Sequence, residues 1–369
     1  MSKAAELAKA GETLTNQPSG RKNLVTNGSM QVAQRSVSET GKGDASGYFT
    51  CDRWKVETDN SAGRFTMSQT ADGPSGFANC LKLDCTTADT SIASDEYLII
   101  SHRLEGQDVQ QFKKGTSDAE QITVSFYVKG DQAATYVVEL FEQTNLRNNT
   151  QAFSVTTSWN RIELTFAADT TGVPADNNAL GWQLNFWLHG GSDYTSGTFA
   201  SNTWGSQTPA NKYAGSKTSF YDSTDRELFI TGVQMEIGSQ ATNFEHRSFG
   251  EELALCQRYY YRHADHSENS ANSVIGVGFY YSSSVIMTYV PFKQTMRIST
   301  PTLEFASGSN YYILQRDGTT DGINDFTIGA RGTNGCKIDN ADESSGDAGK
   351  AGIMMTDNDA SYIAFDAEL

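Results

Sequence analysis

The segment from Gly181 to Tyr194 reads GWQLNFWLHGGSDY and carries the side chains best suited to bind a ligand. Its alternation of apolar and other residues predicts a β-strand. One face of this strand would fill a core with Trp182, Leu184, Phe186 and Leu188. The opposite face would present Gln183, Asn185, Trp187 and His189. An indole ring flanked by amide side chains can stack on a sugar ring and hydrogen-bond its hydroxyl groups.

Further aromatic residues follow this strand on segments rich in Gly, Ser and Asn: Tyr194, Trp204 and Tyr213. Loops often carry binding residues, so these three complete the predicted glycan-binding set. The pattern also fits an alternative in which Trp187 packs beneath a loop or at a subunit contact, because aromatic residues are enriched at interfaces as well. Trp54 and Trp159 each begin a predicted strand, and we expect both to pack in the core.

Metal binding receives weaker support from the sequence. His263, His266 and Cys256 come nearest to a zinc site, but their spacing is loose and a fourth ligand is missing. A second segment offers oxygen ligands that suit calcium: Asp339, Asp342, Glu343 and Asp347. It does not have EF-hand spacing, and its glycines fit turns. We therefore predict a solvated acidic loop and no cofactor, with calcium as the alternative.

The sequence contains no recognisable catalytic motif. Patterns of the G-x-S-x-G, H-E-x-x-H and P-loop kinds do not occur. The paired carboxylates of a glycoside hydrolase remain an alternative, because two acidic residues can meet in the fold from distant positions. Depolymerase spikes usually carry a repetitive β-helix, whereas no repeat of fixed period is visible here. We predict a protein that is not an enzyme.

The composition fits a β-rich protein with many loops. The 369 residues include 33 Gly, with 37% hydrophobic and 20% charged residues. Acidic residues outnumber basic ones by 44 to 28, the net charge is −16 and no basic block occurs, so we exclude nucleic-acid binding. The sequence shows no signal peptide and no apolar run of about 20 residues, which argues against membrane insertion. Five scattered cysteines predict reduced thiols, with a Cys80–Cys85 disulfide as the alternative.

The secondary structure that positions the candidate binding residues is predicted along the chain, starting with a short N-terminal module. Residues 1–20 predict one helix and a linker that dock against another chain, or else a frayed terminus. Residues 21–247 contain several short strands with one-sided alternation and polar loops between them, which predicts an antiparallel β-sandwich. The last of these strands would place one set of residues on a single face: Phe229, Thr231, Val233, Met235 and Ile237.

A short connecting helix is predicted over residues 248–262. Ser248 and Glu251 match a capping box, and apolar residues down to Tyr260 share one helix face. Residues 263–369 predict a smaller β-domain that serves oligomerisation or forms a tip. Its hairpin near 274–291 would place four residues on one face: Ile275, Val277, Phe279 and Tyr281. Such a small core and its exposed aromatic strand faces often need a partner chain.

Three motifs make the chain resemble a known family. NLVTNGSMQVAQR at 23–35, YFTCDRW at 48–54 and GVQMEIGSQATNFEHRSFGEELALCQRYY at 232–260 are similar to a domain that recurs in bacteriophage virion proteins, usually tail-fibre or structural proteins. The resemblance covers roughly residues 20–262 and reappears in YIAFDAEL at 362–369. It favours a jelly roll for the sandwich, which is the architecture of many carbohydrate-binding modules.

The resemblance implies a virion structural protein, assembled in the host cytoplasm as a tail or capsid appendage. Residues 1–20 would then dock the protein to the particle. The implied partners are other virion proteins, further copies of the chain in a homotrimer, and a host-surface glycan. Two alternatives remain open: a glycan-degrading hydrolase of the virion, and a structural adaptor that contacts other virion proteins and binds no sugar.

Overall fold

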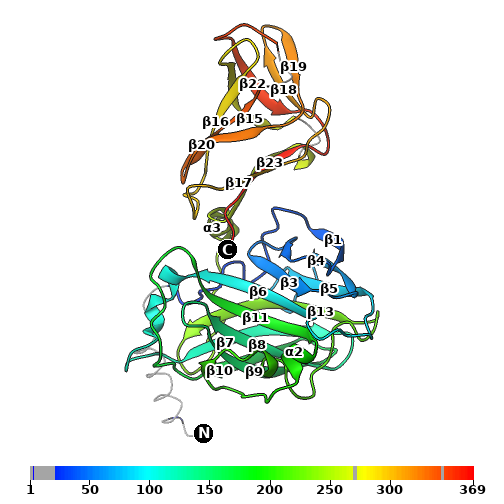
Figure 1. Cartoon of the computed structure of the whole chain (residues 1–369), viewed down its shortest axis with the longest axis vertical. Coiled ribbons are helices and arrows are strands. Elements are labelled where there is room, and N and C mark those ends of the chain that lie inside the picture. The colour runs from blue at the N-terminus through cyan, green and yellow to red at the C-terminus, as the bar shows by residue number, and fades with distance from the viewer. Residues whose placement is uncertain (1–2, 4–20, 269–271, 342–344) are drawn as a thin grey trace. The chain divides into compact units, whose positions relative to one another are not determined.

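The computed structural model describes residue 3 and residues 21–268, 272–341 and 345–369. The predicted docking helix within residues 1–20 therefore lies, apart from Lys3, outside the described residues. Internal contacts divide the chain into two units. The first unit extends to Glu252 and includes Leu369, and the second comprises Leu253–Glu368. Figure 1 draws the first unit from blue to green and the second from yellow to red.

The first unit is built from two antiparallel sheets. Sheet A has, in spatial order, β1 (Ser38–Lys42), β4 (Arg64–Thr70), β5 (Cys80–Thr87), β13 (Glu227–Ile237), β7 (Ile122–Gly130) and β10 (Asn160–Phe166). Sheet B has β12 (Gly205–Ser206), β9 (Arg147–Val155), β8 (Ala134–Glu142), β11 (Leu180–Gly190), β6 (Tyr97–Glu105), β3 (Trp54–Asp59) and β2 (Gly47–Tyr48). Many sequence neighbours are not sheet neighbours, as in a jelly roll.

The two sheets pack face to face around one apolar core, as Figure 1 shows. Phe126 of sheet A meets Phe186 of sheet B edge to face, with ring centroids 5.0 Å apart. Trp54 and Trp182 are buried in this core, as predicted. Trp159 is not: it lies half-buried beside Phe229 on the other side of sheet A, so its predicted core position is wrong. The mainly β, jelly-roll-like sandwich is confirmed.

A bulge in β13 divides the face that strict alternation predicts for this strand. Its register against β7 shifts between Thr231 and Gln234, around Gly232 with a φ of +62°. Val233 and Met235 enter the core, whereas Phe229 lies beneath the Lys129 ammonium on the opposite face. The prediction of one face from Phe229 to Ile237 is therefore wrong before the bulge.

The helix after the sandwich is shorter than predicted. Helix α3 spans Phe249–Gln257, and Glu251 accepts hydrogen bonds from the Ser248 main chain and hydroxyl at 3.1 and 3.0 Å. This reciprocal contact confirms the capping box. Tyr260 does not belong to the helix, however, because β14 (Tyr260–Asp265) begins there. The remaining helical elements are η1 (Gly106–Phe112), α2 (Ser192–Thr195), η2 (Pro209–Asn211) and η3 (His266–Glu268).

The second unit contains two further antiparallel sheets around its own core. Sheet C has β14, β23 (Tyr362–Asp366) and β17 (Thr302–Phe305). Sheet D has β19 (Thr319–Ile323), β18 (Tyr312–Arg316), β22 (Ala351–Thr356), β15 (Val274–Tyr280), β16 (Ile286–Pro291), β21 (Gly335–Asn340) and β20 (Thr327–Gly332). Strand β14 starts before the predicted boundary at residue 263, since it pairs with β23.

The hairpin of β15 and β16 is present, but its predicted common face is not. The register of β15 against β22 shifts between Val274 and Gly276. This bulge keeps Ile275 in the core and turns Val277 and Phe279 outward, while Gly278 and Tyr280 are buried. A single extra residue in a strand is enough to exchange its two faces.

All five cysteines are buried and free, which confirms reduced thiols. Cys80 and Cys85 lie on the same strand, β5, so the alternative disulfide does not form. Within the described ranges, no helix is long and apolar enough to cross a membrane.

Candidate functional site

Strand β11 carries the predicted glycan-binding residues on the face of sheet B that points away from the core. Trp182, Leu184, Phe186 and Leu188 belong to the core, so the predicted alternation is confirmed. The outward residues are nevertheless buried as well: Gln183, Asn185, Trp187 and His189. Only 2% of Trp187 is exposed. An indole buried in this way does not offer its face to a sugar from solvent.

Residues 191–221, here called the strap, cover this part of sheet B. The strap leaves the end of β11 through α2, bridges Thr150 at Ser201, and pairs as β12 with the edge strand β9. It then returns through η2, and the Tyr213 N–H donates to the Tyr194 carbonyl oxygen at 2.9 Å. The alternative in which Trp187 packs beneath a loop is therefore what the structure shows.

A buried carboxylate, Glu139 of β8, holds the covered residues together. It accepts hydrogen bonds from Trp187 Nε1 at 2.7 Å, Asn185 Nδ2 at 3.1 Å and Asn148 Nδ2 at 2.8 Å. The ammonium group of Lys212, a residue of the strap, lies 3.1 Å from Glu139 Oε1. Burial by itself raises the pKa of Glu139, but Lys212 and these donors together hold it below its ordinary value. Because all these groups contact the Glu139 carboxylate, we infer that it stabilises the fold and does not transfer protons.

The other predicted residues have structural roles, and Tyr213 also stacks against Trp187 at 6.3 Å. His189 Nε2 donates to Glu96 at 3.2 Å and Nδ1 accepts from Ser219 at 2.8 Å, and burial lowers the pKa of His189. Tyr213 donates to the Thr218 carbonyl oxygen. Trp204 donates to the Ala167 carbonyl oxygen at 2.6 Å and packs against Trp182, so it does not join the Trp187 cluster.

One part of the cluster reaches the surface, and we call it the tyrosine edge: Tyr97, Tyr194, Glu57 and Asp59. The rings of Tyr97 and Tyr194 are half-buried and meet edge to face at 5.4 Å. Trp187 supports both from beneath, at 6.1 and 5.2 Å. Gly190, which pairs with Tyr97, has no side chain to occupy the space next to Tyr194.

Acidic residues border the tyrosine edge. Burial, with a smaller contribution from the neighbouring carboxylates of Glu57 and Asp59, raises the pKa of Tyr97 to about 12. Asp59 likewise adds to the raised pKa of Tyr194, after burial. Both phenols therefore keep their protons at neutral pH and can donate hydrogen bonds. Sequence reasoning missed Tyr97, although it begins the alternating strand YLIIS.

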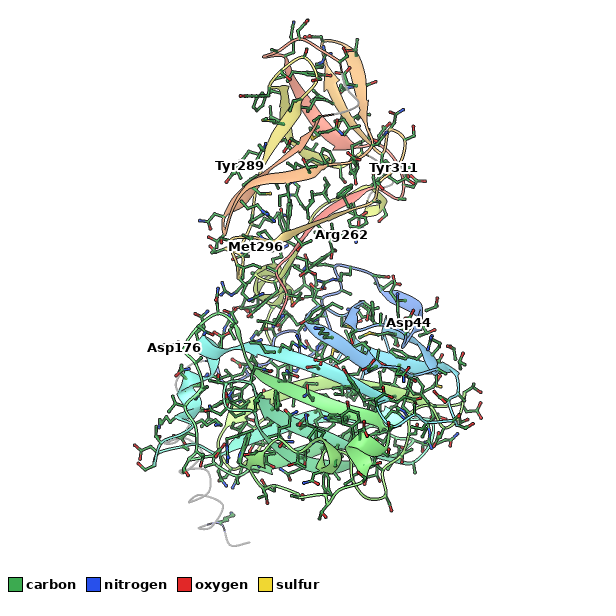
Figure 2. The ribbon with its side chains drawn as sticks, in the orientation of Figure 1. Asp44, Asp176, Arg262, Tyr289, Met296 and Tyr311 are labelled. Atoms are coloured by element: carbon green, nitrogen blue, oxygen red, sulfur yellow. The ribbon has the colours of Figure 1, made fainter. Side chains whose placement is uncertain are left out.

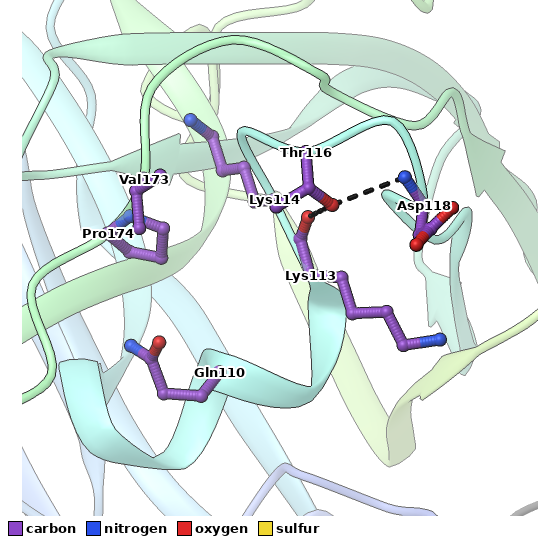
Figure 3. Close-up of a pocket in the computed structure, with 7 residues that line it drawn as sticks. All are labelled: Gln110, Lys113, Lys114, Thr116, Asp118, Val173 and Pro174. Atoms are coloured by element: carbon purple, nitrogen blue, oxygen red, sulfur yellow. Dashed lines mark hydrogen bonds between the residues drawn. The ribbon is translucent and has the colours of Figure 1, made fainter.

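A hollow of about 320 Å³ lies elsewhere in the first unit, between the end of η1 and Val173–Pro174 (Figure 3). Its lining residues are Gln110, Lys113, Lys114, Thr116, Asp118, Val173 and Pro174. Lys113 pairs with Glu120 at 2.6 Å. The buried Lys114 ammonium donates to two main-chain oxygens at 2.7 Å and lies 3.2 Å from Asp169. With no aromatic ring and no uncompensated cation in its lining, this hollow lacks the groups that hold a sugar or an anion.

No group of three or more metal-ligating side chains gathers in the described parts of the chain. His263 Nε2 instead donates to the Ile275 carbonyl oxygen at 2.7 Å, and Cys256 is buried in α3. Of the predicted acidic loop, Asp339 pairs with Lys337 at 3.0 Å, whereas Asp342 and Glu343 lie outside the described residues.

Comparison with models of known protein families finds no match, and comparison with characterised protein sequences finds none either. Solved structures do match. A family 4 carbohydrate-binding module is 11% identical with a TM-score of 0.30, covering 58% of this chain and 99% of the module. A family 11 module from Clostridium thermocellum, in complex with a mixed-linked tetrasaccharide, is 12% identical with a TM-score of 0.27, covering 57% of this chain and 99% of that one.

The enzymatically active domain of a tailspike protein from bacteriophage CBA120 also matches, at 12% identity and a TM-score of 0.28. That match covers 58% of this chain and 21% of the tailspike domain.

Proposed function

We propose that this chain is a structural protein of a bacteriophage virion, a tail or capsid appendage whose first unit binds host-surface glycan without cleaving it. The protein is assembled in the host cytoplasm with other virion proteins and with copies of itself. The three sequence motifs at 23–35, 48–54 and 232–260 support virion membership. The observation that carries glycan binding is the tyrosine edge.

The tyrosine edge has the two kinds of group that sugar binding needs. Half-open phenol rings supply apolar faces for the C–H groups of a sugar ring. Phenol hydroxyls and carboxylates next to them supply donors and acceptors for its hydroxyl groups. Because Trp187 and the strap fix both rings from behind, little side-chain freedom is lost on binding.

The charge of the tyrosine edge indicates the class of glycan. Glu57, Asp59, Asp95 and Asp193 all lie close enough to raise the pKa of one or both phenols. Arg103 pairs with Glu57 at 2.9 Å, so the net negative charge beside the rings comes from the three aspartates. An anionic sugar would meet repulsion from these carboxylates and from a chain of net charge −16. A neutral, hydroxyl-rich glycan is therefore the ligand that fits.

Titration of the purified full chain with host-surface polysaccharide tests this function. Tyr97→Ala and Tyr194→Ala should each weaken binding by about 1–2 kcal/mol, as expected for loss of an aromatic stacking contact. Tyr289→Ala, at an exposed tyrosine of the second unit, is the matched control and should bind as the unaltered protein does.

Three outcomes would contradict the proposal in different ways. Unchanged binding in both variants would place the glycan elsewhere. A falling mass of the polysaccharide would indicate the hydrolase, and no binding at all to host polysaccharide would indicate the adaptor. Circular dichroism of each variant separates a lost contact from a lost fold.

A further inference from the structure

The face of sheet D that points away from its core carries a concentration of exposed apolar side chains. Of the eleven large hydrophobic residues exposed in the described chain, six lie on β15, β16 and β22 or directly beside them: Val274, Val277, Phe279, Tyr281, Tyr289 and Ile353. Exposed fractions reach 64% for Val277 and 61% for Tyr289, whose side chain is labelled in Figure 2. A contiguous apolar patch of this kind marks an interaction surface.

Strand register arranges this face in two neighbouring rows. In the first row Ile353 pairs with Val277, and Tyr289 pairs with Lys337. The adjacent Gly278–Thr288 pair of β15 and β16 places Val277 next to Tyr289. The second row, two residues along each strand, runs through Ala351, Phe279, Met287 and Asp339. Each row is apolar over three strands and ends in one charged residue on β21.

The two charged residues make the face neutral. Lys337 and Asp339 lie 3.0 Å apart on the same strand and carry opposite charges. The whole chain, by contrast, carries a net charge of −16, so most pairs of its surfaces repel each other when two copies meet. A neutral apolar face is the place where identical chains can associate without this penalty.

We propose that this face binds the same face of a second copy of the chain, about a two-fold axis that runs between the two rows and across the strands. Such an axis lays the first row of one copy over the second row of the other. Lys337 then meets Asp339 of the second copy, and Asp339 meets its Lys337. This reciprocal pairing is what an isologous contact requires.

The apolar residues are complementary under the same operation. Ile353, a large side chain, falls over the small Ala351 of the second copy. Val277 falls over Phe279, and Tyr289 over the flexible Met287. Packing two sheets face to face in this way buries the open side chains at the spacing of a β-sandwich, about 10 Å. The contact is independent of whether the first unit binds glycan.

Light scattering of the purified full chain at micromolar concentration is the first test. We expect a mass twice the 40.2 kDa of one chain, in place of the homotrimer that the sequence resemblance implies. Val277→Asp should give the mass of a single chain, because it places a charge in the apolar centre of the contact. Val37→Asp is the matched control, since Val37 is 60% exposed in the first unit, and this variant should remain dimeric.

Charge exchange tests the two-fold register itself. Lys337→Asp places like charges opposite each other twice in a symmetric dimer, and so does Asp339→Lys. Each variant alone should therefore dissociate about 100-fold more readily, as expected when like charges face each other at an interface. Mixing the two variants should restore the dimer, because the acid at position 337 of one chain then meets the lysine at position 339 of the other.

Several results would overturn the proposal. They are a monomer or a trimer in the unaltered protein, a dimer that Val277→Asp leaves intact, and charge variants that do not associate on mixing. A glycan that binds a monomeric chain and is lost in Val277→Asp would assign the face to sugar instead. Both charge substitutions lie on an exposed strand face, and circular dichroism confirms the fold before each measurement.

Discussion

The outer faces of sheet B and sheet D illustrate two ways to treat the second side of a β-sheet. Sheet B carries polar and aromatic residues there, and the strap covers them while Glu139 and Lys212 satisfy their polar groups. Sheet D carries Val277, Phe279 and Tyr289 on the corresponding face, and within the described part of its unit no segment covers them. The outer face of sheet B is covered by a segment of the same chain. The outer face of sheet D is open to contact with another molecule.

This difference indicates where each unit meets its surroundings. On sheet B the open surface that we propose as the ligand site is the tyrosine edge, which is small and has directional hydrogen-bonding groups. On sheet D the open surface is broad and mostly apolar. Small polar sites select small polar ligands, whereas broad apolar faces favour protein contacts. The two proposals therefore assign different kinds of recognition to the two units.

The largest expected contrast between the two faces is in folding stability. Trp187→Ala should lower the free energy of unfolding by about 3–5 kcal/mol, because it leaves a cavity beneath the strap. Tyr289→Ala should change it by less than about 0.5 kcal/mol in the monomer, since its side chain is already in water. Urea unfolding at a concentration that keeps the chain monomeric measures both values. Equal losses would show that the strap does not protect Trp187.

A similar contrast applies to the charged residue on each face. Glu139→Gln should cost about 3 kcal/mol, because the buried Lys212 ammonium loses its counter-charge. Asp339→Asn on sheet D should cost under about 1 kcal/mol in the monomer, since a partly exposed ion pair contributes little. Thermal unfolding of both variants is the comparison. A large loss in Asp339→Asn would mean that the sheet D face is held by its own charges.

Acid should weaken the first unit through its buried histidines, and His102 gives the clearest case. Burial lowers the pKa of His102 well below 6.5, so the folded chain keeps it neutral while the unfolded chain takes up a proton. Stability is therefore full above pH 6.5 and falls as the pH drops below it, by up to about 1.4 kcal/mol per pH unit. In His102→Gln the free energy of unfolding should fall less steeply below pH 6.5, when the value of the same variant at pH 8 is the reference.

The smallest effect concerns the hydroxyl group of Tyr97. Tyr97→Phe keeps the ring that Trp187 supports but removes the phenol donor. Glycan affinity should fall by about 0.5–1.5 kcal/mol, the usual worth of one hydrogen bond, with no change in unfolding free energy beyond about 0.5 kcal/mol. Calorimetric titration next to Tyr97→Ala separates the ring from the hydroxyl. An affinity loss as large as in Tyr97→Ala would show that the ring contributes no stacking.

The sequence predicted the strands and the faces of β11 better than the contacts between segments that are distant in sequence. Alternation placed Trp182 in the core and Trp187 on the opposite face correctly, because period two is a local property of the chain. It did not predict that Lys212 would cover Trp187, since this contact joins residues far apart in sequence. The Tyr97–Tyr194 pair was missed for the same reason: the pairing of β6 with β11 creates it.

Bulges account for the remaining differences. At Gly232 and at Val274–Gly276 one residue shifts the register, and every later side chain changes face. Strict alternation therefore grouped Phe229 with Val233 and Ile275 with Val277, although the two residues of each pair lie on opposite faces of their strand. Nothing in the hydrophobic pattern marks these positions, because both segments are apolar on both sides of the bulge.

Hydroxyl-radical footprinting of the full chain tests the contrast between the two faces most directly. We expect oxidation of Phe279 and Tyr289 to fall as protein concentration rises, while that of Tyr97 and Tyr194 stays constant. Added host glycan should protect Tyr97 and Tyr194 and leave Phe279 and Tyr289 unchanged. Trp187 should remain protected throughout, because the strap covers it. Oxidation of Phe279 and Tyr289 that does not depend on concentration, or glycan protection of these two residues, would contradict the account.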